Sequence, residues 1–321
     1  MKAIVYTEYG SPDVLQLREV PKPVPTDDEI LIKIHAVSVN RSDWEGLIGK
    51  PLYARVGGLR KPRGQILGSD IAGRVEVIGK NNTQFQPGDE VFGEMADYRG
   101  GFAEYVCARG KFLALKPPRM TFEEAAAIPQ AGVIALQSIC DKGRVQPGQN
   151  VLINGGGGGA GMFAIQLAKM YGAEVTGVDN TGKQDFMRSL GADHVIDYTR
   201  EDFTRNGKQY DLILDLIAHR SVFDYQRALK PNGSYFAVGG SVATLFEIFL
   251  LGPWIRMATS KNVRVLAVQR SRKNLEAITE LCEAGKVIPV IDKRYPLSDV
   301  PEALRYLGEG HARGKLVITV Q

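Results

Sequence analysis

Cysteine is scarce in this chain of 321 residues: there are three, Cys107, Cys140 and Cys282, and they lie far apart. An odd number of isolated cysteines does not make a disulfide framework. Histidine is nearly as rare, with four residues, and none lies in a cluster that has the spacing of metal ligands. Because tetrahedral zinc needs several Cys, His or carboxylate ligands, we expect no metal site.

The chain also lacks an excess of charge and a long apolar run. Its 40 Lys and Arg residues face 36 Asp and Glu residues, and a formal net charge of +4 is too small to indicate a nucleic acid or an anionic membrane as partner. The most apolar segment, 244–255, is shorter than the roughly 20 residues that span a bilayer, so we interpret it as a buried or interface helix. The first residues resemble a strand rather than a targeting peptide, which favours a cytoplasmic location.

The pattern of apolar residues indicates two domains, which fits the length. From 1 to 120, short alternating runs broken by Gly and Pro predict mainly β structure. From 121 to 268, strand and helix alternate, which predicts an α/β fold with a doubly wound parallel sheet. From 269 to 321 the β patterning returns, and this tail is expected to complete the first domain.

Six strands are predicted for the second domain, at 151–153, 174–178, 194–196, 212–216, 235–238 and 263–268. The helix after the first of these strands has apolar residues at helical spacing, and we expect this stripe to face the core. Its members are Ala164, Leu167, Ala168 and Tyr171.

A run of glycines lies between the first of these strands and its helix. Gly156, Gly158 and Gly161 have the G-x-G-x-x-G spacing of a dinucleotide-binding turn. The first glycine would allow the tight turn, the second would let a pyrophosphate approach, and the third would let helix pack on strand. With Gly159 and Ala160, they would place the phosphates at the helix N-terminus, although a flexible loop remains the alternative.

An acidic residue, Asp179, ends the next strand at about the distance where an acid binds the adenosine ribose 2′-OH. This favours NAD(H), because a carboxylate repels the 2′-phosphate of NADP(H). Asn180 and Lys183 follow at once and could instead hold that phosphate. Asp179 could also be only a helix cap, so the choice between the two cofactors stays open.

These features occur within a longer series of motifs that resembles the medium-chain dehydrogenase/reductase superfamily, in its zinc-free, quinone-oxidoreductase-like branch. The motifs are VSVNRSDW at 37–44, LGSDIAG at 67–73, PGDEVFG at 87–93, GFAEY at 101–105, LGAD at 190–193 and GHARGK at 310–315. The resemblance covers essentially the whole chain. It implies a GroES-like catalytic domain, completed by the C-terminal tail, an inserted Rossmann domain and an active site in the cleft.

The resemblance also implies roles for single residues. Zinc-dependent members have a Cys near the position of Asn40 and a His-Glu pair where this chain has Ser69 and Asp70, so the resemblance implies a zinc-independent enzyme. Asn40 would bind the nicotinamide ribose or the substrate oxygen, unless it only caps a turn. Tyr53 would donate a proton to a developing oxyanion, unless it only packs. Residues implied at the cofactor are Tyr198 near the adenosine, Ala218 near the ribose, and Val238, Gly239 and Gly240 near the nicotinamide.

The function implied is transfer of a hydride from NAD(P)H to a small electron-poor acceptor, either a quinone or an α,β-unsaturated carbonyl. The resemblance suggests NADPH, whereas Asp179 leaves NADH open. Two alternatives remain: a metal-free alcohol or aldehyde oxidoreductase, and a non-catalytic nucleotide-binding protein with a structural or regulatory role. The apolar segment could make a homodimer interface. The identity of the substrate and the proton donor stay open.

Overall fold

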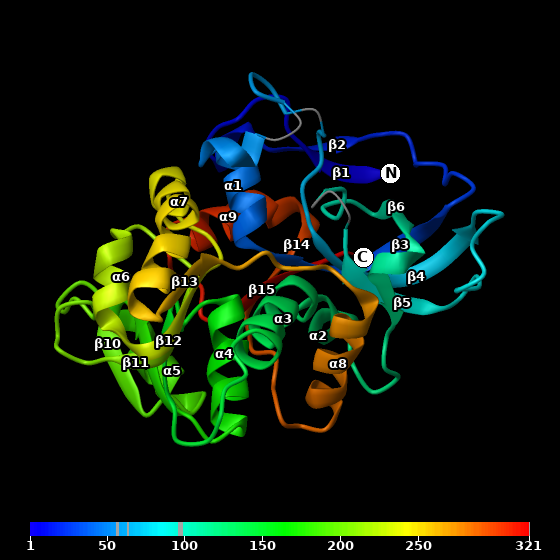
Figure 1. Ribbon diagram of the computed structural model, residues 1–321. Helices are drawn as coiled ribbons and strands as arrows, with labels where there is room; N and C mark the ends of the chain where they lie inside the picture. The colour runs from blue at the N-terminus through cyan, green and yellow to red at the C-terminus, as the bar shows by residue number, and fades with distance from the viewer. Residues whose placement is uncertain (56–57, 63, 96–98, 321) are drawn as a thin grey trace. The chain divides into compact units, whose positions relative to one another are not determined.

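The computed structural model describes residues 1–55, 58–62, 64–95 and 99–320, and it forms two compact units (Figure 1). The first unit comprises Met1–Gln130, Arg270–Glu283 and Pro289–Gln321, and the second comprises Ala131–Gln269 and Ala284–Ile288. Helix α2 (Phe122–Ala126) lies beyond the predicted boundary after residue 120, yet it packs on strands of the first unit.

The second unit is built on a six-stranded sheet in which all neighbouring strands are parallel. All six predicted strands are present, and the largest shift is at β12, which begins at Leu229. Across the sheet the order is β10 (His194–Asp197), β9 (Glu174–Asp179), β8 (Asn150–Asn154), β11 (Tyr210–Asp215), β12 (Leu229–Ala237) and β13 (Asn262–Val265). The chain leaves β8 toward β9 and returns to the other side of β8 at β11, so the carboxyl end of β8 is the switch point of the fold.

Helices connect these strands by crossovers, which are right-handed in parallel sheets and therefore place α4 and α5 on one face and α6 and α7 on the other. The helices of this unit are α3 (Pro129–Leu136), which continues into a π-helical turn (Gln137–Asp141), α4 (Gly159–Met170), α5 (Gln184–Ser189), α6 (Val222–Ala228) and α7 (Val242–Thr259). Ala164, Leu167 and Ala168 of α4 are buried as predicted. Tyr171 is exposed instead, because α4 ends at Met170 and Tyr171 is its C-cap.

Helix α7 is longer and more exposed than its sequence predicted. By length and composition it is the one described helix that is apolar enough to cross a membrane, but only 22% of it is buried. Burial, one of the two alternatives expected for this segment, is therefore wrong for most of it, because many of its apolar side chains are exposed. We call this surface the α7 face; its large exposed residues are Val242, Phe246, Phe249, Leu250, Trp254 and Met257.

The first unit contains a seven-stranded sheet and a two-stranded sheet. Its strands are β1 (Lys2–Val5), β2 (Gln16–Glu19), β3 (Glu29–Val39), β4 (Asp70–Ile78), β5 (Glu90–Glu94), β6 (Tyr105–Arg109), β7 (Leu113–Leu115), β14 (Ile291–Pro296) and β15 (Lys315–Thr319). The large sheet has the order β14-β15-β3-β4-β5-β7, and β6 also pairs with β3. Buried Ile and Val side chains of β3, β4 and β15 form its core.

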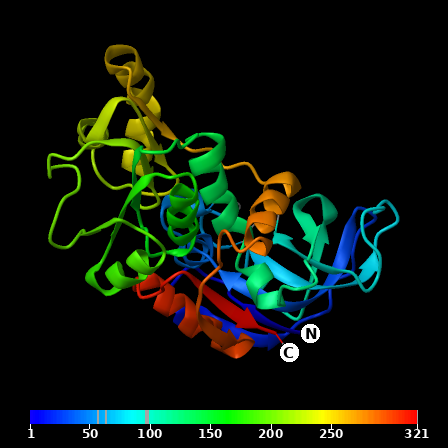
Figure 2. The same cartoon turned by 90° about the horizontal axis from the view of Figure 1, so that it is seen from below.

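The C-terminal tail contributes β14 and β15 to this sheet. β15 lies antiparallel to β3 (Figure 2), with Leu316 opposite Val39. The remaining helices of the unit are α1 (Arg41–Ile48), α8 (Arg272–Glu283) and α9 (Val300–Gly308). β3 leads directly through Asn40 into α1, so β15 brings the GHARGK motif beside the start of α1.

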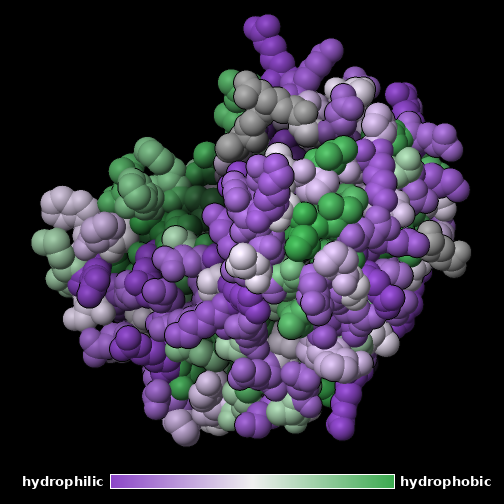
Figure 3. Space-filling view, turned by 90° about the vertical axis from the view of Figure 1, so that its right-hand side faces the viewer, coloured by the Kyte–Doolittle hydropathy of each residue, from purple (hydrophilic) through white to green (hydrophobic). Residues whose placement is uncertain are grey.

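Hydrophilic side chains cover most of the face shown in Figure 3, where apolar side chains gather in a few small groups and in one larger group toward the left of the view. Scattered apolar residues are normal on a protein surface, whereas a contiguous row along one helix indicates an interaction site.

Candidate functional site

The glycine loop joins β8 to α4 at the carboxyl edge of the parallel sheet. Gly155 makes the turn, with a φ of +87° that L side chains rarely adopt. Gly158 is the N-cap of α4, and a Cβ there would meet only the Gly155 oxygen, at 3.4 Å. A Cβ at Gly161 would lie 2.2 Å from that oxygen, so only glycine lets α4 pack this close to the turn.

The positive φ of the tight turn is therefore at Gly155 and not at Gly156, where the spacing predicted it. Gly156 does not have a positive φ, and a Cβ there would meet chiefly the flexible Met187 side chain, with Sδ at 2.8 Å. Because five glycines follow one another, the sequence does not tell which of them makes the turn. The positive φ shows that it is Gly155. Gly158 and Gly161 lie where the spacing predicted.

The amino end of α4 is suited to an anion. The N–H groups of Gly159, Ala160 and Gly161 belong to the first helical turn, where no helical carbonyl four residues earlier can accept them. Gly158, Gly159 and Ala160 are only partly buried, and glycine presents no side chain that would keep a ligand from the backbone. The helix dipole adds a partial positive charge at this point. These features fit the pyrophosphate of a dinucleotide.

Asp179 lies at the carboxyl end of β9, beside the glycine loop. Its carboxylate is almost fully buried and accepts hydrogen bonds from the Gly157 N–H at 3.0 Å and the Asn180 N–H at 2.9 Å. The Lys183 ammonium, itself buried, lies 3.4 Å from Asp179 Oδ1. The acid is thus tied to the loop and neutralised by a lysine, so it repels a 2′-phosphate less than an unpaired carboxylate would.

The next strand end completes this group. Tyr198 follows β10, its side chain is exposed, and its N–H donates to the Asp179 carbonyl at 3.2 Å. Asp197, which the sequence analysis missed, accepts hydrogen bonds from the hydroxyls of Thr181 and Thr199. These bonds, Thr181 first, lower the pKa of Asp197. The structure therefore gathers the predicted residues Asp179, Asn180, Lys183 and Tyr198 at adjacent strand ends next to the loop.

The loops after β11 and β12 are joined to each other. The Ala218 N–H donates to the Gly239 carbonyl at 2.9 Å, and the Ser241 N–H donates to the Ala218 carbonyl at 2.8 Å. A Cβ at Gly240 would lie 2.0 Å from the Ala218 oxygen, so this junction requires glycine. Ala218 is fully buried and both of its backbone groups are bonded, which suits it to fixing the two loops rather than to donating to a ligand. Val238 lies in the same junction, where its N–H donates to the Asp215 backbone carbonyl at 2.9 Å.

In the first unit, Asn40 is the N-cap of α1 and is held by a buried polar network. Its Nδ2 donates to Ser69 Oγ at 3.0 Å and to Asp70 Oδ2 at 2.8 Å, and its Oδ1 accepts from Lys315 Nζ. Its backbone N–H donates to Asp43 Oδ2 at 2.7 Å, so Asp43 helps to cap this helix. Both amide protons of Asn40 are used, which leaves its oxygen as the atom that can also accept a ligand hydroxyl.

We call Asn40, Asp43, Asp70, Glu94 and Lys315 the Asn40 cluster. Glu94 joins it because Gln130 donates from Nε2 to Glu94 Oε1 at 2.9 Å and from its N–H to Asp70 Oδ2 at 3.2 Å. Burial raises the pKa of Asp43 to about 7. Burial, together with the charge of Asp70, raises the pKa of Glu94 to about 8. Burial lowers the pKa of Lys315, and the three carboxylates oppose this.

Tyr53 is not brought to the cluster. It lies in a 3₁₀ turn (Leu52–Arg55), is 39% exposed, and its hydroxyl donates to Glu45 Oε2 at 3.5 Å. Burial raises the pKa of Glu45.

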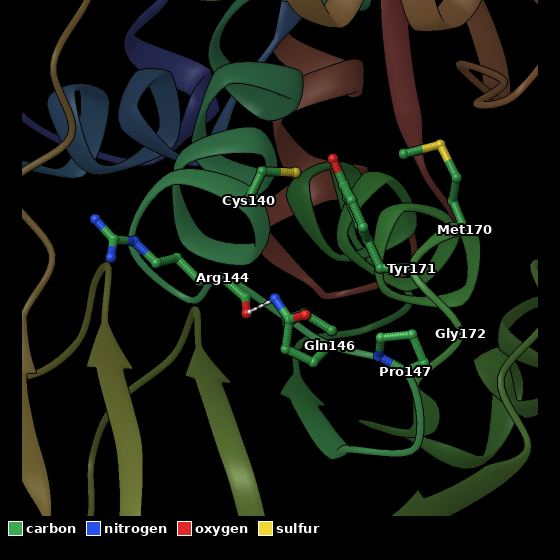
Figure 4. Close-up of a pocket in the computed structure, with 8 residues that line it drawn as sticks. Cys140, Arg144, Gln146, Pro147, Met170, Tyr171 and Gly172 are labelled. Carbon is green, nitrogen blue, oxygen red and sulfur yellow. Dashed lines mark hydrogen bonds between the residues drawn. The ribbon is translucent and has the colours of Figure 1, made fainter.

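A cavity of the second unit lies away from the glycine loop. It has a volume of about 630 Å³ and lies at the carboxyl end of α4, whereas the loop lies at the amino end of the same helix (Figure 4). Its lining includes Cys140, Arg144, Gln146, Met170 and Tyr171. Burial raises the pKa of the Cys140 thiol to about 11, which makes it a poor nucleophile.

The chain matches two family profiles. Residues 26–118 match the alcohol dehydrogenase GroES-like domain, and residues 190–318 match a family described as zinc-binding dehydrogenase. It is 32% identical to the chloroplastic quinone oxidoreductase QR1 of Triphysaria versicolor over 99% of this chain and 98% of the relative. It is 33% identical to the chloroplastic NADPH-dependent alkenal/one oxidoreductase of Arabidopsis thaliana, over 99% of this chain and 79% of the relative.

A solved quinone oxidoreductase from Coxiella burnetii has the same fold, with a TM-score of 0.88, 31% identity, and coverage of 100% of this chain and 99% of that one. The chain belongs to the medium-chain dehydrogenase/reductase superfamily. Its branch is the quinone-oxidoreductase-like one, and the fold expected from that resemblance is confirmed.

Within this superfamily, the positions that the resemblance assigns to zinc ligands are occupied by different chemistry. The structure brings Asn40, Ser69 and Asp70 together, and the cation among them is the Lys315 ammonium, 3.8 Å from Asp70 Oδ2. No group of three or more His, Cys, Asp or Glu side chains in the described ranges is arranged to hold a metal. An amide, a hydroxyl and one carboxylate form a poor donor set for tetrahedral zinc.

Proposed function

We propose that the chain is an NAD(P)H-dependent reductase that transfers hydride to a quinone or to the β-carbon of an α,β-unsaturated carbonyl. The observation that carries the proposal is the glycine turn at the amino end of α4, with Asp179, Lys183 and Tyr198 at the neighbouring strand ends. Quinone and alkenal/one oxidoreductases are among the relatives that align over nearly the whole chain, which supports these acceptors.

The protein's own residues would hold and orient the dinucleotide. The first-turn N–H groups of α4 would bind the pyrophosphate, and Gly158 would let it approach the backbone. Lys183 and Tyr198 would hold the adenosine end, while the joined loops at Ala218 and Gly240 would set the position of the nicotinamide end. When bound, the cofactor supplies a hydride; the acceptor also takes up a proton.

We further propose that this reaction needs no zinc. The Asn40 cluster offers one buried ammonium, Lys315, where a metal-dependent enzyme would need several metal ligands. Without a metal to polarise an alcohol, reduction of an electron-poor acceptor is the easier chemistry. Among the three candidate functions, a metal-free alcohol or aldehyde oxidoreductase is therefore second, and a non-catalytic nucleotide-binding protein is third.

The test is consumption of NADH and of NADPH by the purified protein with a panel of quinones and enals. Alcohols with the oxidised cofactors, and aldehydes with the reduced ones, form the second panel. Turnover with the first panel and little with the second supports the proposal. Binding of NADPH, seen by its fluorescence, without turnover in either panel would indicate the non-catalytic alternative. One zinc per chain by elemental analysis would overturn the zinc-free part.

For the cofactor, we propose NADPH. Lys183 neutralises Asp179 and lies within reach of any phosphate bound beside it, and a relative that shares this fold is named as NADPH-dependent. Separate dissociation constants for NADPH and NADH test this preference.

A cytoplasmic location stays a prediction.

We also propose that the protein is a homodimer through the α7 face and the adjoining β13. Trp254, Phe249 and Met257 are 69%, 73% and 80% exposed. β13 is an edge strand, with β12 as its partner among the described strands. A second copy would cover the apolar residues and also satisfy the backbone groups of the strand edge. A lipid surface would cover the side chains but leave those backbone groups without partners.

Sedimentation velocity tests this assembly with the Trp254→Glu and Phe249→Glu variants. The wild-type protein should sediment as a dimer and both variants as monomers. A monomeric wild type that floats with lipid vesicles, and loses this binding in the variants, would replace the dimer with a membrane surface.

A further inference from the structure

Lys315 is a buried lysine to which the proposed function gives no role in binding the cofactor. Its side chain is 1% exposed, and its Nζ contacts Asn40 Oδ1, the Val39 carbonyl at 3.4 Å and Asp70 Oδ2 at 3.8 Å. A buried ammonium is costly unless it is paired and hydrogen-bonded. Here the ammonium and Asp70 form a pair, and the Asn40 amide lies between them.

This pair fixes the direction of the Asn40 amide. The oxygen and the NH₂ group of an amide have nearly the same shape, so packing alone does not choose between the two orientations. An ammonium can only donate and an ionised carboxylate can only accept. The flipped amide would place its NH₂ against Lys315 and its oxygen against Asp70, which the charges forbid. The observed orientation therefore follows from Lys315 and Asp70 together.

We propose that Lys315 is a positioning residue of the reductase, which holds the Asn40 oxygen in the one orientation that can accept a hydrogen bond from a ligand hydroxyl. The inference rests on the proposed function and deepens it, since it adds a residue 275 positions from Asn40 in sequence. Asn40 would touch the ligand, and Lys315 would act only through Asn40.

A merely structural ion pair would be needed for stability but not for the rate of a folded enzyme. The charged groups that face Lys315 are Asp70 on β4, Asp43 on α1 and Glu94 on β5. Burial raises the pKa of both Asp43 and Asp70, and the charge of Lys315 opposes this rise. If ionised Asp70 is needed to hold the amide, activity falls as the pH drops through the pKa of this pair, and loss of Lys315 moves that fall to higher pH.

The experiment compares Lys315→Met with Lys116→Met in the full chain, with a quinone and NADPH. Lys116 is a matched control: it is also buried, its ammonium pairs with Glu90 Oε2 at 3.0 Å, and it lies outside the Asn40 cluster. K315M should lower kcat on the order of 100-fold, the scale expected when a ligand is misplaced by about 1 Å. It should also shift the acid limb of the kcat pH profile upward. K116M should keep the wild-type kcat and profile.

Two further measurements keep the outcome decisive. If K315M does not fold, the double variant K315M/D70N, which removes both charges, takes its place and should show the same loss of kcat in a folded protein. Wild-type kcat and an unshifted profile in whichever variant folds would overturn the inference. If the wild type itself shows no turnover, the proposed function fails, and titration of NADPH fluorescence then tests Lys315: the dissociation constant should rise in K315M and not in K116M.

Discussion

Replacing either of two glycines, Gly158 or Gly161, by alanine should have different effects: one variant should lose NADPH affinity and the other should lose stability. Gly161→Ala places a Cβ 2.2 Å from the Gly155 oxygen and 2.6 Å from the Gly156 Cα. Both are backbone atoms, so α4 must move away from the turn. Gly158→Ala places its Cβ no closer than 3.4 Å to any atom outside its immediate chain neighbours, at a φ of −90° that alanine adopts freely.

The magnitudes follow from these contacts. Overpacking of this kind costs about 1–3 kcal/mol, and contacts this short on immobile backbone belong at the upper end. G161A should therefore lose about 3 kcal/mol of unfolding free energy. G158A should lose little, but its methyl group would keep a phosphate from the first-turn N–H groups. A hydrogen bond to a charged group contributes about 1.5–3 kcal/mol, so NADPH should bind roughly 10- to 100-fold more weakly.

The assay is urea unfolding without cofactor, followed by titration of NADPH fluorescence for each variant. Gly156→Ala is the matched control, because its Cβ meets chiefly a flexible methionine, and it should change both quantities little. Reduced stability in G158A with unchanged NADPH binding would refute the reasoning, since it would mean that this backbone does not face a phosphate.

Two further predictions concern charge. Asp179→Ser should release Lys183 from its ion pair and raise the affinity for NADPH relative to NADH by about tenfold, or about 1.4 kcal/mol, in paired titrations; an unchanged ratio would place Asp179 away from the ribose. The pKa of Glu94 is about 8, above its ordinary 4.5, so the folded state keeps a proton that the unfolded chain has lost. Between the unfolded and the folded pKa of Glu94, the free energy of unfolding should therefore fall by ~1.4 kcal/mol for each unit by which the pH rises. The test is urea unfolding of the Glu94→Gln variant and of the wild type from pH 7 to pH 8, a range in which Asp43 contributes less to the pH dependence. The free energy of unfolding should fall less steeply with pH in the variant than in the wild type. An equal fall in both proteins would contradict the raised pKa of Glu94.

The sequence predicted those features that depend on local patterns. Short apolar runs located all six parallel strands, because buried strands need continuous apolar residues. The order of strand, glycine loop and helix located the glycine turn at the amino end of α4, and Asp179 marked the end of the next strand. The antiparallel pairing of β15 with β3 agreed with the β patterning of the tail.

Features that depend on distant contacts could not be predicted. Nothing near Asn40 in sequence indicates that Lys315 and Asp70 determine the direction of its amide, because β15 and β4 meet α1 only in the folded sheet. The turn glycine was misassigned because the register of five glycines depends on a single φ value. The choice between a buried and an interface helix stayed open for α7, because apolar composition does not tell whether a helix faces the protein or the outside.

The central claim is tested most directly by metal-depleted wild-type protein, assayed by the decrease in NADPH absorbance with a quinone and with an enal. We predict catalytic turnover of at least one acceptor, with one NADPH oxidised per acceptor reduced and no gain on addition of zinc. An absence of turnover with every quinone and enal tested, or a rate that requires added zinc, would contradict the account.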